Sequence, residues 1–286
     1  MTRRRGPITP DSVARRVVHN GGQPEEDAVV VEAPLEIRVD GETLSVTMRT
    51  PGHDQALAVG FLFAEGVICS RDDFSRAEHA CVEGEGGACN VVDVQLNSSA
   101  PGNAGGRPAV RRGTLSTAAC GVCGRLTIRD LLEICRPQPV VPTVGQGVLA
   151  RATAELDNNQ SDFATTGGSH AAAILDTNGV VLSAHEDIGR HNAVDKVVGA
   201  LVTSGSVRRP PEDTDEPRPA ILVVSGRVSF EIVQKCAVAG VPVVAGVSAA
   251  SSLAIDLADE MGVTLAAFAR NGRFNLYTHP QRVIGS

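Results

Sequence analysis

The spacing of apolar residues predicts a small α+β unit early in the chain. The segment APLEIRVDGETLSVTM alternates apolar and polar residues around Asp40-Gly41, a dipeptide that favours a tight hairpin turn. PGHDQALAVGFLFAEG has apolar residues at helical spacing and reaches Gly66, where a helix can end. A short strand, VVDVQL, follows. We predict a flexible arm over the polar residues 1–25 and an α+β domain over residues 26–112.

The second part of the chain alternates strand-like and helix-like segments. AAAILD and VVLSA are apolar runs around Asn178-Gly179, a second hairpin signal. RHNAVDKVVGALV, SFEIVQKCAVAG and SAASSLAIDLADEMG have helical spacing, whereas AILVVSG, VPVVAGV and VTLAAFA are typical of buried strands. This alternation predicts an α/β domain over residues 113–286, with a largely parallel sheet covered by helices on both faces. RLTIRDLLEIC predicts one further helix, and residues 204–218 a solvated loop.

Composition and charge restrict the partners and the compartment. Only 3% of the 286 residues are aromatic and the net charge is −7, which argues against base stacking and against binding a nucleic-acid backbone. No apolar run is long enough for a bilayer, and none follows the basic start, so we predict neither a membrane span nor a secretory signal. Seven irregularly spaced cysteines do not form a disulfide framework, which favours the cytoplasm.

The close pair Cys120 and Cys123 is the strongest candidate for chemistry. It lies in TAACGVCG, where the flanking glycines allow a sharp turn. The helix predicted just after it would place partial positive charge near the pair, and Arg125 would add a full charge. Both effects favour the thiolate, which is the nucleophilic form of cysteine. We therefore predict that Cys120 and Cys123 are catalytic thiols.

Other roles for this pair stay open on the residues alone. A zinc site needs four ligands, and Cys69, Cys81 and Cys89 are spaced too irregularly to complete one, so we predict no metal site. A buried structural role suits a pair beside two glycines poorly. A thioredoxin-like redox pair is the stronger competitor, although such a pair normally follows the first strand of a compact domain. Cys135 and Cys236 are predicted to be packing residues.

A dense polar cluster extends from His185 to Asp195, around a predicted helix start. Glu186 and Asp187 can cap a helix, but two histidines with an arginine exceed what capping needs, and histidine titrates near neutrality. The role of the cluster is left open. Zinc deaminases use H-x-E before P-C-x-x-C; here the order is reversed and Glu186 directly follows His185, which disfavours that chemistry.

Polar residues follow three predicted strands at their carboxyl ends, where open α/β sheets bind ligands. Arginines and a helix start at these ends predict an anion site suited to phosphates. The Asn-Gly dipeptide in the last segment has ordinary hairpin chemistry as its alternative, and no Walker or dinucleotide fingerprint is present. The residues at these ends are Ser225, Gly226, Arg227, Ser248, Phe268, Ala269, Arg270, Asn271, Gly272 and Arg273.

Together these motifs resemble the formate dehydrogenase accessory sulfurtransferase family, FdhD. The similarity runs from APLEIRV to YTHPQR and includes RTPG-x-D with GFLFAEG, CGVCG, TGGSHAAA, EDIGRHNAVDK, SGRVSFE and FARNGR. Several matches in the same order are more specific than any single motif. The resemblance implies a cytidine-deaminase-like α/β/α sheet domain with a smaller α+β N-terminal domain, and a homodimer.

The resemblance also implies a function. The family is understood to take sulfur from a cysteine desulfurase and to deliver it to the molybdenum bis(molybdopterin guanine dinucleotide) cofactor, which formate dehydrogenase requires. Carried over by position, Cys120 would bear the persulfide and Cys123 would be its partner. The cofactor would be bound as a client by the FARNGR segment, and the motifs TGGSHAAA and EDIGRHNAVDK place His170 and His191 in the same site. No tightly held metal of the protein's own is implied.

Two other classes of protein fit parts of the same pattern. A thiol–disulfide oxidoreductase would use the cysteine pair and would need no nucleotide site. A chaperone that binds a nucleotide-bearing cofactor would keep its activity in a Cys120→Ala variant. Loading of sulfur on Cys120 therefore separates these classes from a sulfur carrier.

Overall fold

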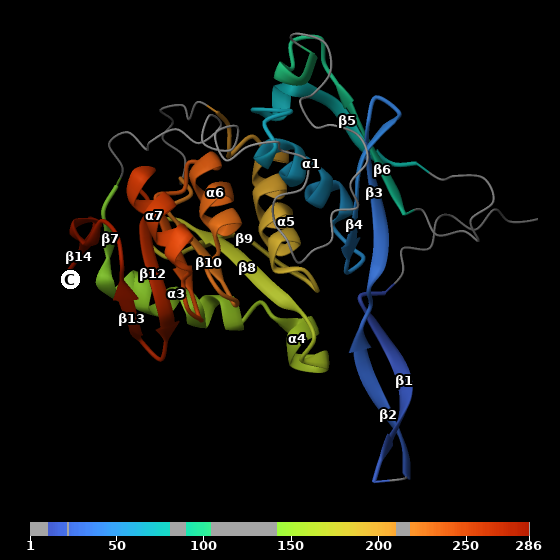
Figure 1. Ribbon diagram of the computed structural model, residues 1–286, viewed down its shortest axis with the longest axis horizontal. Helices are drawn as coiled ribbons and strands as arrows, with labels where there is room; N and C mark the ends of the chain where they lie inside the picture. The colour runs from blue at the N-terminus through green and yellow to red at the C-terminus, as the bar shows by residue number, and fades with distance from the viewer. Residues whose placement is uncertain (1–10, 22, 81–89, 104–141, 210–217, 286) are drawn as a thin grey trace, which may run out of the picture.

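A six-stranded mixed sheet lies at the centre of the protein (Figure 1). The computed structural model describes residues 11–21, 23–80, 90–103, 142–209 and 218–285. The strand order of this sheet is β13-β12-β11-β10-β8-β9. Its strands are β8 (His170–Leu175), β9 (Val181–Asp187), β10 (Ile221–Val224), β11 (Val243–Gly246), β12 (Thr264–Arg270) and β13 (Arg273–Leu276).

The strand directions differ from the prediction. The pairs β10–β11 and β11–β12 are parallel, but β8–β9, β8–β10 and β12–β13 are antiparallel. The α/β class is confirmed, whereas the prediction of a largely parallel sheet is wrong. Two of the antiparallel pairs are hairpins with Asn178-Gly179 or Asn271-Gly272 in the turn, and such turns return the chain to a neighbouring strand. Apolar runs predict that a strand is buried, and they carry no information on its direction.

Helices cover both faces of the central sheet, as predicted. Alternate residues of each strand contribute to separate cores: Ile174 and Val224 pack with α5, α6 and α7, whereas Leu175 and Val223 pack with α3. This period of two follows from the pleat of a strand that is buried on both sides. The helices around the sheet are α3 (Gln146–Asp157), α4 (Ser161–Thr166), α5 (Arg190–Thr203), α6 (Phe230–Val238) and α7 (Ser252–Glu260).

A second sheet, of order β4-β3-β6-β5, is joined to the first through α1 (Asp54–Ala64). The predicted hairpin, helix and VVDVQL strand are all confirmed in this part. Helix α1 packs on α5 (Figure 1), and residues of both helices belong to one hydrophobic cluster. Because the two parts share this cluster, the domain boundary stays a prediction. The strands are β3 (Ala33–Val39), β4 (Glu42–Arg49), β5 (Phe74–His79) and β6 (Val91–Leu96).

A two-stranded hairpin, β1 (Val13–Asn20) and β2 (Gln23–Val30), projects from the rest of the molecule (Figure 1). Residues 13–20 of the predicted flexible arm form a strand, while residues 1–10 of it lie outside the described part of the chain. Val17 keeps 67% of its surface exposed, and most of β2 is exposed too. A ribbon that is mostly exposed needs no apolar alternation, so the sequence lacks the usual signal for a strand.

Short elements complete the described chain. The two-residue strands β7 (Val144–Gly145) and β14 (Val283–Ile284) pair in parallel. None of the helices in the described ranges combines the length and the apolar character that crossing a membrane requires. The 3₁₀ turns are Arg71–Asp73, Pro101–Asn103 and Pro280–Arg282.

Candidate functional site

The ends of three strands meet at one edge of the central sheet. Because β10, β11 and β12 are mutually parallel, the segments at their carboxyl ends lie side by side. The N–H of Ser248 donates to the carbonyl of Gly226 at 3.4 Å, and the N–H of Phe268 donates to the carbonyl of Ser248 at 3.0 Å. The structure thus brings together parts of all three predicted segments. We call residues 225–227, Ser248 and Phe268, with His170 beside them, the carboxyl edge.

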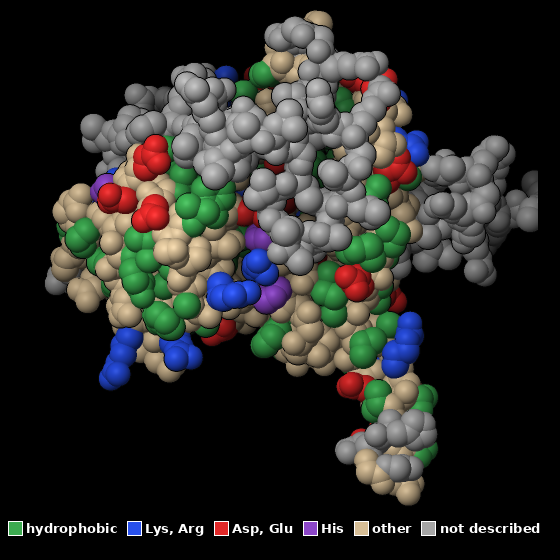
Figure 2. All heavy atoms as spheres, in the orientation of Figure 1, with side chains coloured by type: hydrophobic (Ala, Val, Ile, Leu, Met, Phe, Trp, Pro, Cys, Tyr) green, Lys and Arg blue, Asp and Glu red, His purple; other side chains and the backbone are tan. Residues whose placement is uncertain are grey.

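Strand β8 pairs antiparallel with β10, so its first residue, His170, lies at the same edge as the end of β10. Ser225 holds the end of β10 against the start of β8, because its hydroxyl accepts a hydrogen bond from the N–H of Ala171 at 2.9 Å. A Cβ built on Gly226 would lie 3.7 Å from Nδ1 of His170, so the ring lies directly beside the glycine. Burial lowers the pKa of His170, and the charge of Arg190 lowers it further, so both favour the neutral imidazole. Figure 2 shows histidine and Lys or Arg side chains together near the middle of one face.

His191, in the first turn of α5, is part of a buried polar chain next to the carboxyl edge. Its Nε2 lies 3.3 Å from the hydroxyl of Ser229, and its Nδ1 lies 3.1 Å from the carboxylate of Glu231. Burial, with the charge of Lys235 adding to it, lowers the pKa of His191 to about 3. Sequence analysis missed Ser229 and Glu231, although the SGRVSFE motif contains both. The sequence signal that could have revealed them is their position, two residues apart, at the start of the helix that follows β10, a strand whose carboxyl end was predicted to bind a ligand.

The two arginines of FARNGR lie at the tip of the β12–β13 hairpin. Arg270 and Arg273 are partners in the strand register and both are exposed. Between them, Asn271 and Gly272 adopt positive φ angles of 53° and 72°. Ordinary hairpin chemistry therefore accounts for the Asn-Gly dipeptide. The arginines remain available to a ligand, but the turn itself is no evidence of one.

Phe268 has an unusual backbone conformation. The register of β12 and β13 shifts between Ala267 and Arg270, and Phe268 within this irregularity has a φ of 53°. Positive φ is rare for a bulky residue and is found at bulges next to functional sites. The bulge leaves the phenyl ring 41% exposed, while Ala269 is buried in the core beneath the sheet. Arg227, on the neighbouring segment, is exposed.

The predicted thiol pair, Cys120 and Cys123, lies outside the described residues, together with Cys135 and the predicted helix RLTIRDLLEIC. Cys236 is fully buried, as predicted, and burial raises the pKa of its thiol. Cys69 is half-buried. Within the part of the chain that the structure describes, no group of three or more His, Cys, Asp or Glu side chains is placed to hold a metal ion.

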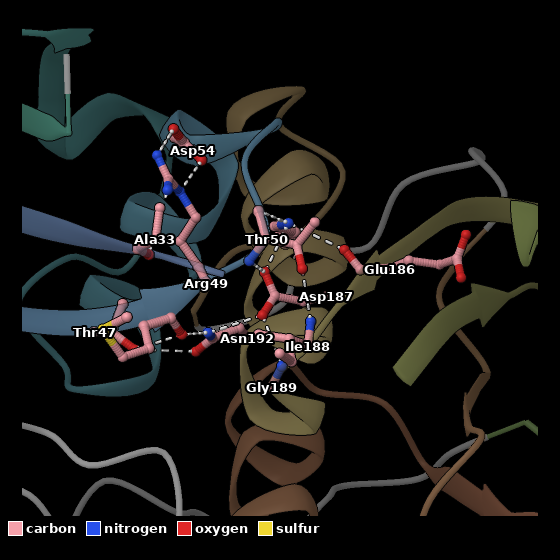
Figure 3. Close-up of polar contacts among 12 residues, drawn as sticks. Ala33, Thr47, Arg49, Thr50, Asp54, Glu186, Asp187, Ile188, Gly189 and Asn192 are labelled. Atoms are coloured by element: carbon pink, nitrogen blue, oxygen red, sulfur yellow. Dashed lines mark hydrogen bonds and ion pairs between the residues drawn. The ribbon is translucent and has the colours of Figure 1, made fainter. Parts of the chain in front are cut away.

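The cluster from His185 to Asp195 has a structural role that the sequence left open. Asp187 is fully buried and accepts hydrogen bonds from the N–H of Thr50 at 3.1 Å and from the N–H of Gly189 at 2.8 Å (Figure 3). Lys196 lies 2.8 Å from the same carboxylate and donates to the carbonyl of Thr50. Glu186 caps helix α4, because its carboxylate accepts two backbone N–H bonds there at 2.8 Å.

These contacts fasten the N-terminal sheet to the start of α5. Thr50 follows β4, so its bonds to Asp187 and Lys196 connect the second sheet with the helix that carries His191. Nearby, Arg49 is fully buried and forms a paired contact with Asp54 at 2.9 Å (Figure 3). We call the contacts among Thr50, Asp187 and Lys196 the Asp187 junction. This junction sets where α5 begins relative to the carboxyl edge.

A buried histidine with a lowered pKa is expected to make the folded protein less stable in acid. Burial lowers the pKa of His185 to about 4, and the nearby His53 and Lys196 add to the shift. An unfolded histidine has a pKa of about 6.5, so below this pH the unfolded state binds more protons and the free energy of unfolding falls. We expect urea unfolding to show lower stability at pH 5 than at pH 7, with a smaller difference in His185→Gln. An equally large difference in the variant would contradict this assignment.

The fold is of the α/β class, and polar residues gather at the carboxyl ends of its parallel strands. The chain matches the model of the FdhD/NarQ family over residues 30–284. It belongs to the FdhD/NarQ family, and the resemblance seen in the motifs is confirmed.

Curated relatives and one solved structure agree with this assignment. A protein named "Sulfur carrier protein FdhD" from Anaeromyxobacter dehalogenans is 48% identical over 280 residues, which cover 98% of this chain and 96% of the relative. One of the same name from Mycolicibacterium paratuberculosis is 44% identical and covers 94% of this chain and 97% of the relative. A solved structure from Desulfotalea psychrophila, described as a candidate formate dehydrogenase accessory protein, has a TM-score of 0.70 at 23% identity, over 95% of this chain and 98% of that chain. At that identity the likeness shows the fold alone.

Proposed function

We propose that this protein is a sulfur carrier that accepts persulfide sulfur on Cys120 and delivers it to the bis(molybdopterin guanine dinucleotide) cofactor of formate dehydrogenase. The observation that carries the proposal is the similarity to proteins named as sulfur carriers, which are 48% and 44% identical to this chain over nearly its full length. The CGVCG sequence supplies a thiol pair suited to that role, and the carboxyl edge supplies a polar surface for a large anionic substrate. The donor would be a cysteine desulfurase and the client formate dehydrogenase, with the protein acting as a homodimer.

The loading step follows the chemistry of thiol–disulfide exchange. The thiolate of Cys120 attacks the outer sulfur of the donor's persulfide. A new S–S bond forms at Cys120 while the donor's own S–S bond breaks, and the donor's cysteine leaves as a thiolate. No external oxidant is needed, because the transferred sulfur keeps its oxidation state. Cys123, three residues along the sequence from Cys120, would receive this sulfur, or would release it as sulfide by forming a disulfide with Cys120.

The residues at the carboxyl edge fit an anionic substrate. The net charge of −7 means that a phosphate must be held by local groups, and the exposed Arg227 lies on the same edge as Gly226 and Ser248, whose backbones are hydrogen-bonded. Gly226 leaves room for close approach next to His170. The strained Phe268 offers an exposed ring to an apolar or aromatic part of the substrate. The tip arginines, Arg270 and Arg273, would reach the substrate from outside this edge.

Sulfur loading is the test of this function. Incubation with a cysteine desulfurase and cysteine should add one sulfur to the peptide that contains Cys120, as measured by mass spectrometry. Cys120→Ala should abolish that addition. Cys69→Ala is the matched control and should load normally, since Cys69 lies far from the motif in the sequence. Loading confined to Cys69 or Cys236 would overturn the proposal, and cofactor binding without any loading would favour a chaperone.

A further inference from the structure

One arginine next to the carboxyl edge has no role in the site described above. Arg190 is the first residue of α5. A Cβ built on Gly226 would lie 3.7 Å from Cδ of Arg190 and 3.7 Å from Nδ1 of His170. Arg190 and His170 therefore both border the glycine on the segment that follows β10. The sequence placed this arginine in the cluster from His185 to Asp195 but gave it no individual role.

One nitrogen of the Arg190 guanidinium lacks an acceptor of the kind that Arg49 and Arg282 have. Its Nε is shielded from solvent and has no hydrogen-bond acceptor among the residues that the structure describes. In contrast, Arg49 binds both carboxylate oxygens of Asp54, and Arg282 donates to the carbonyl of Gly262 at 2.7 Å. A buried N–H without an acceptor is costly, and a charged one more so. The position is therefore suited to an acceptor that comes from outside the chain.

The nearby carboxylates are already paired with other groups. One oxygen of Glu231 lies 3.4 Å from Nζ of Lys235. Its other oxygen lies 3.1 Å from Nδ1 of His191 but has no hydrogen-bond partner among the described residues. Asp187 is paired with Lys196 at 2.8 Å and accepts backbone hydrogen bonds as well. The guanidinium therefore has no direct ion pair with either carboxylate, although its charge acts on Glu231 through space: burial raises the pKa of Glu231, and Arg190 is among the cations that oppose the rise.

The start of α5 adds to this positive charge. Its N-cap residue is Gly189, which has no side chain, and no side chain caps the first turn. The exposed N–H groups of a first turn carry the positive end of the helix dipole and favour an anion. Arg190 places a full positive charge at the same end. Because a guanidinium presents two parallel N–H donors, the arrangement matches the oxygens of a phosphate.

We propose that Arg190 binds a phosphate group of the substrate directly, at the start of α5 beside Gly226 and His170. The inference rests on the proposed function in one respect, namely that the substrate carries nucleotide phosphates. It adds a phosphate contact that the sequence motifs did not indicate. It also gives α5 a direct part in binding, since the helix held by the Asp187 junction then carries a residue that touches substrate.

Calorimetric titration with GDP and with inorganic pyrophosphate tests the proposal. Arg190→Ala should weaken binding of both probes about ten-fold or more, the change expected when a charge-assisted hydrogen bond is lost. Arg190→Lys should recover little, because an ammonium lacks the planar fork. Arg76→Ala is the matched control: Arg76 is exposed on β5, pairs with Glu78, and should leave both affinities unchanged.

Thermal unfolding separates a binding role from a structural one. Without ligand, Arg190→Ala should melt at the same temperature as wild type or higher, since it removes an unpaired charge. The rise in melting temperature that GDP gives to wild type should shrink in the variant. Equal affinities for wild type and Arg190→Ala would overturn the proposal, as would a variant that loses GDP but not pyrophosphate, or a wild type that binds neither. Sulfur loading of Cys120, measured in parallel, should be unaffected, and its absence in wild type would count against the proposed function alone.

Discussion

Replacing Lys196 by methionine is expected to lower the free energy of unfolding by about 3–5 kcal/mol, the usual cost of breaking a buried ion pair. The side chains of Lys196 and Asp187 are 1% and 0% exposed, and the pair is 2.8 Å apart. Methionine fills a similar volume but leaves the carboxylate buried without its counter-charge. It also removes the hydrogen bonds from Nζ to the carbonyls of Thr50 and Glu186. Urea denaturation at pH 7 measures this loss.

A second variant shows whether the uncompensated charge causes the loss. The double variant Asp187→Asn with Lys196→Met removes both charges and should regain part of the stability, because no ion is left unpaired. Arg76→Ala serves as the exposed control and should change stability by no more than about 0.5 kcal/mol. A cost below about 1 kcal/mol for Lys196→Met would mean that water or a rearranged partner satisfies Asp187, and the junction would not have the importance given to it here.

The junction matters for function because of what α5 carries. Its first two residues, Arg190 and His191, lie next to the carboxyl edge, while Lys196, about one and a half turns further on, is held by Asp187. Thr50, from the N-terminal sheet, binds the same carboxylate. A shift of this sheet would therefore move the start of α5 relative to the strands. In this way two parts of the chain that lie far apart in sequence jointly determine the shape of the edge.

The sequence predicted the edge itself because short buried strands carry a local signal. The apolar runs before Ser225, Ser248 and Phe268 are each complete within a few residues, and right-handed crossovers then bring their ends together. The family resemblance was likewise carried by local motifs. Both signals are local: each can be recognised in a short stretch of sequence, without knowing which distant residues it contacts in the fold.

Features that depend on distant partners could not be predicted. Asp187 was open to interpretation as a simple cap, because its partner Thr50 lies 137 residues away. The antiparallel pairing of β8 with β10 depends on how the whole chain packs, not on the composition of either strand. Helix α3 is a different case, because Leu149, Ala152 and Leu156 have helical spacing and the local signal for this helix was present in the sequence. The unpartnered Nε of Arg190 is visible only once the positions of Glu231 and its neighbours are known.

Replacing Gly199 by alanine is expected to lower the free energy of unfolding by about 3 kcal/mol, the upper part of the usual range for overpacking a core. A Cβ built there would lie 1.8 Å from the carbonyl oxygen of Ala56 and 2.6 Å from the nitrogen of Gly60. Both obstacles are backbone atoms of α1, so no side chain can turn away and the two helices must separate. The better helix propensity of alanine returns only about 1 kcal/mol.

Gly147→Ala is the matched control, since Gly147 lies in helix α3 and its new methyl group would meet only the flexible end of Arg151 at 3.4 Å. That variant should be as stable as wild type or slightly more so, because alanine reduces the entropy of the unfolded chain. If Gly199→Ala matched it, the close approach of α1 and α5 would not be a fixed feature of the fold. A loss in Gly199→Ala that also weakens GDP binding would instead indicate that the spacing of these helices sets the position of Arg190, since α5 carries both residues.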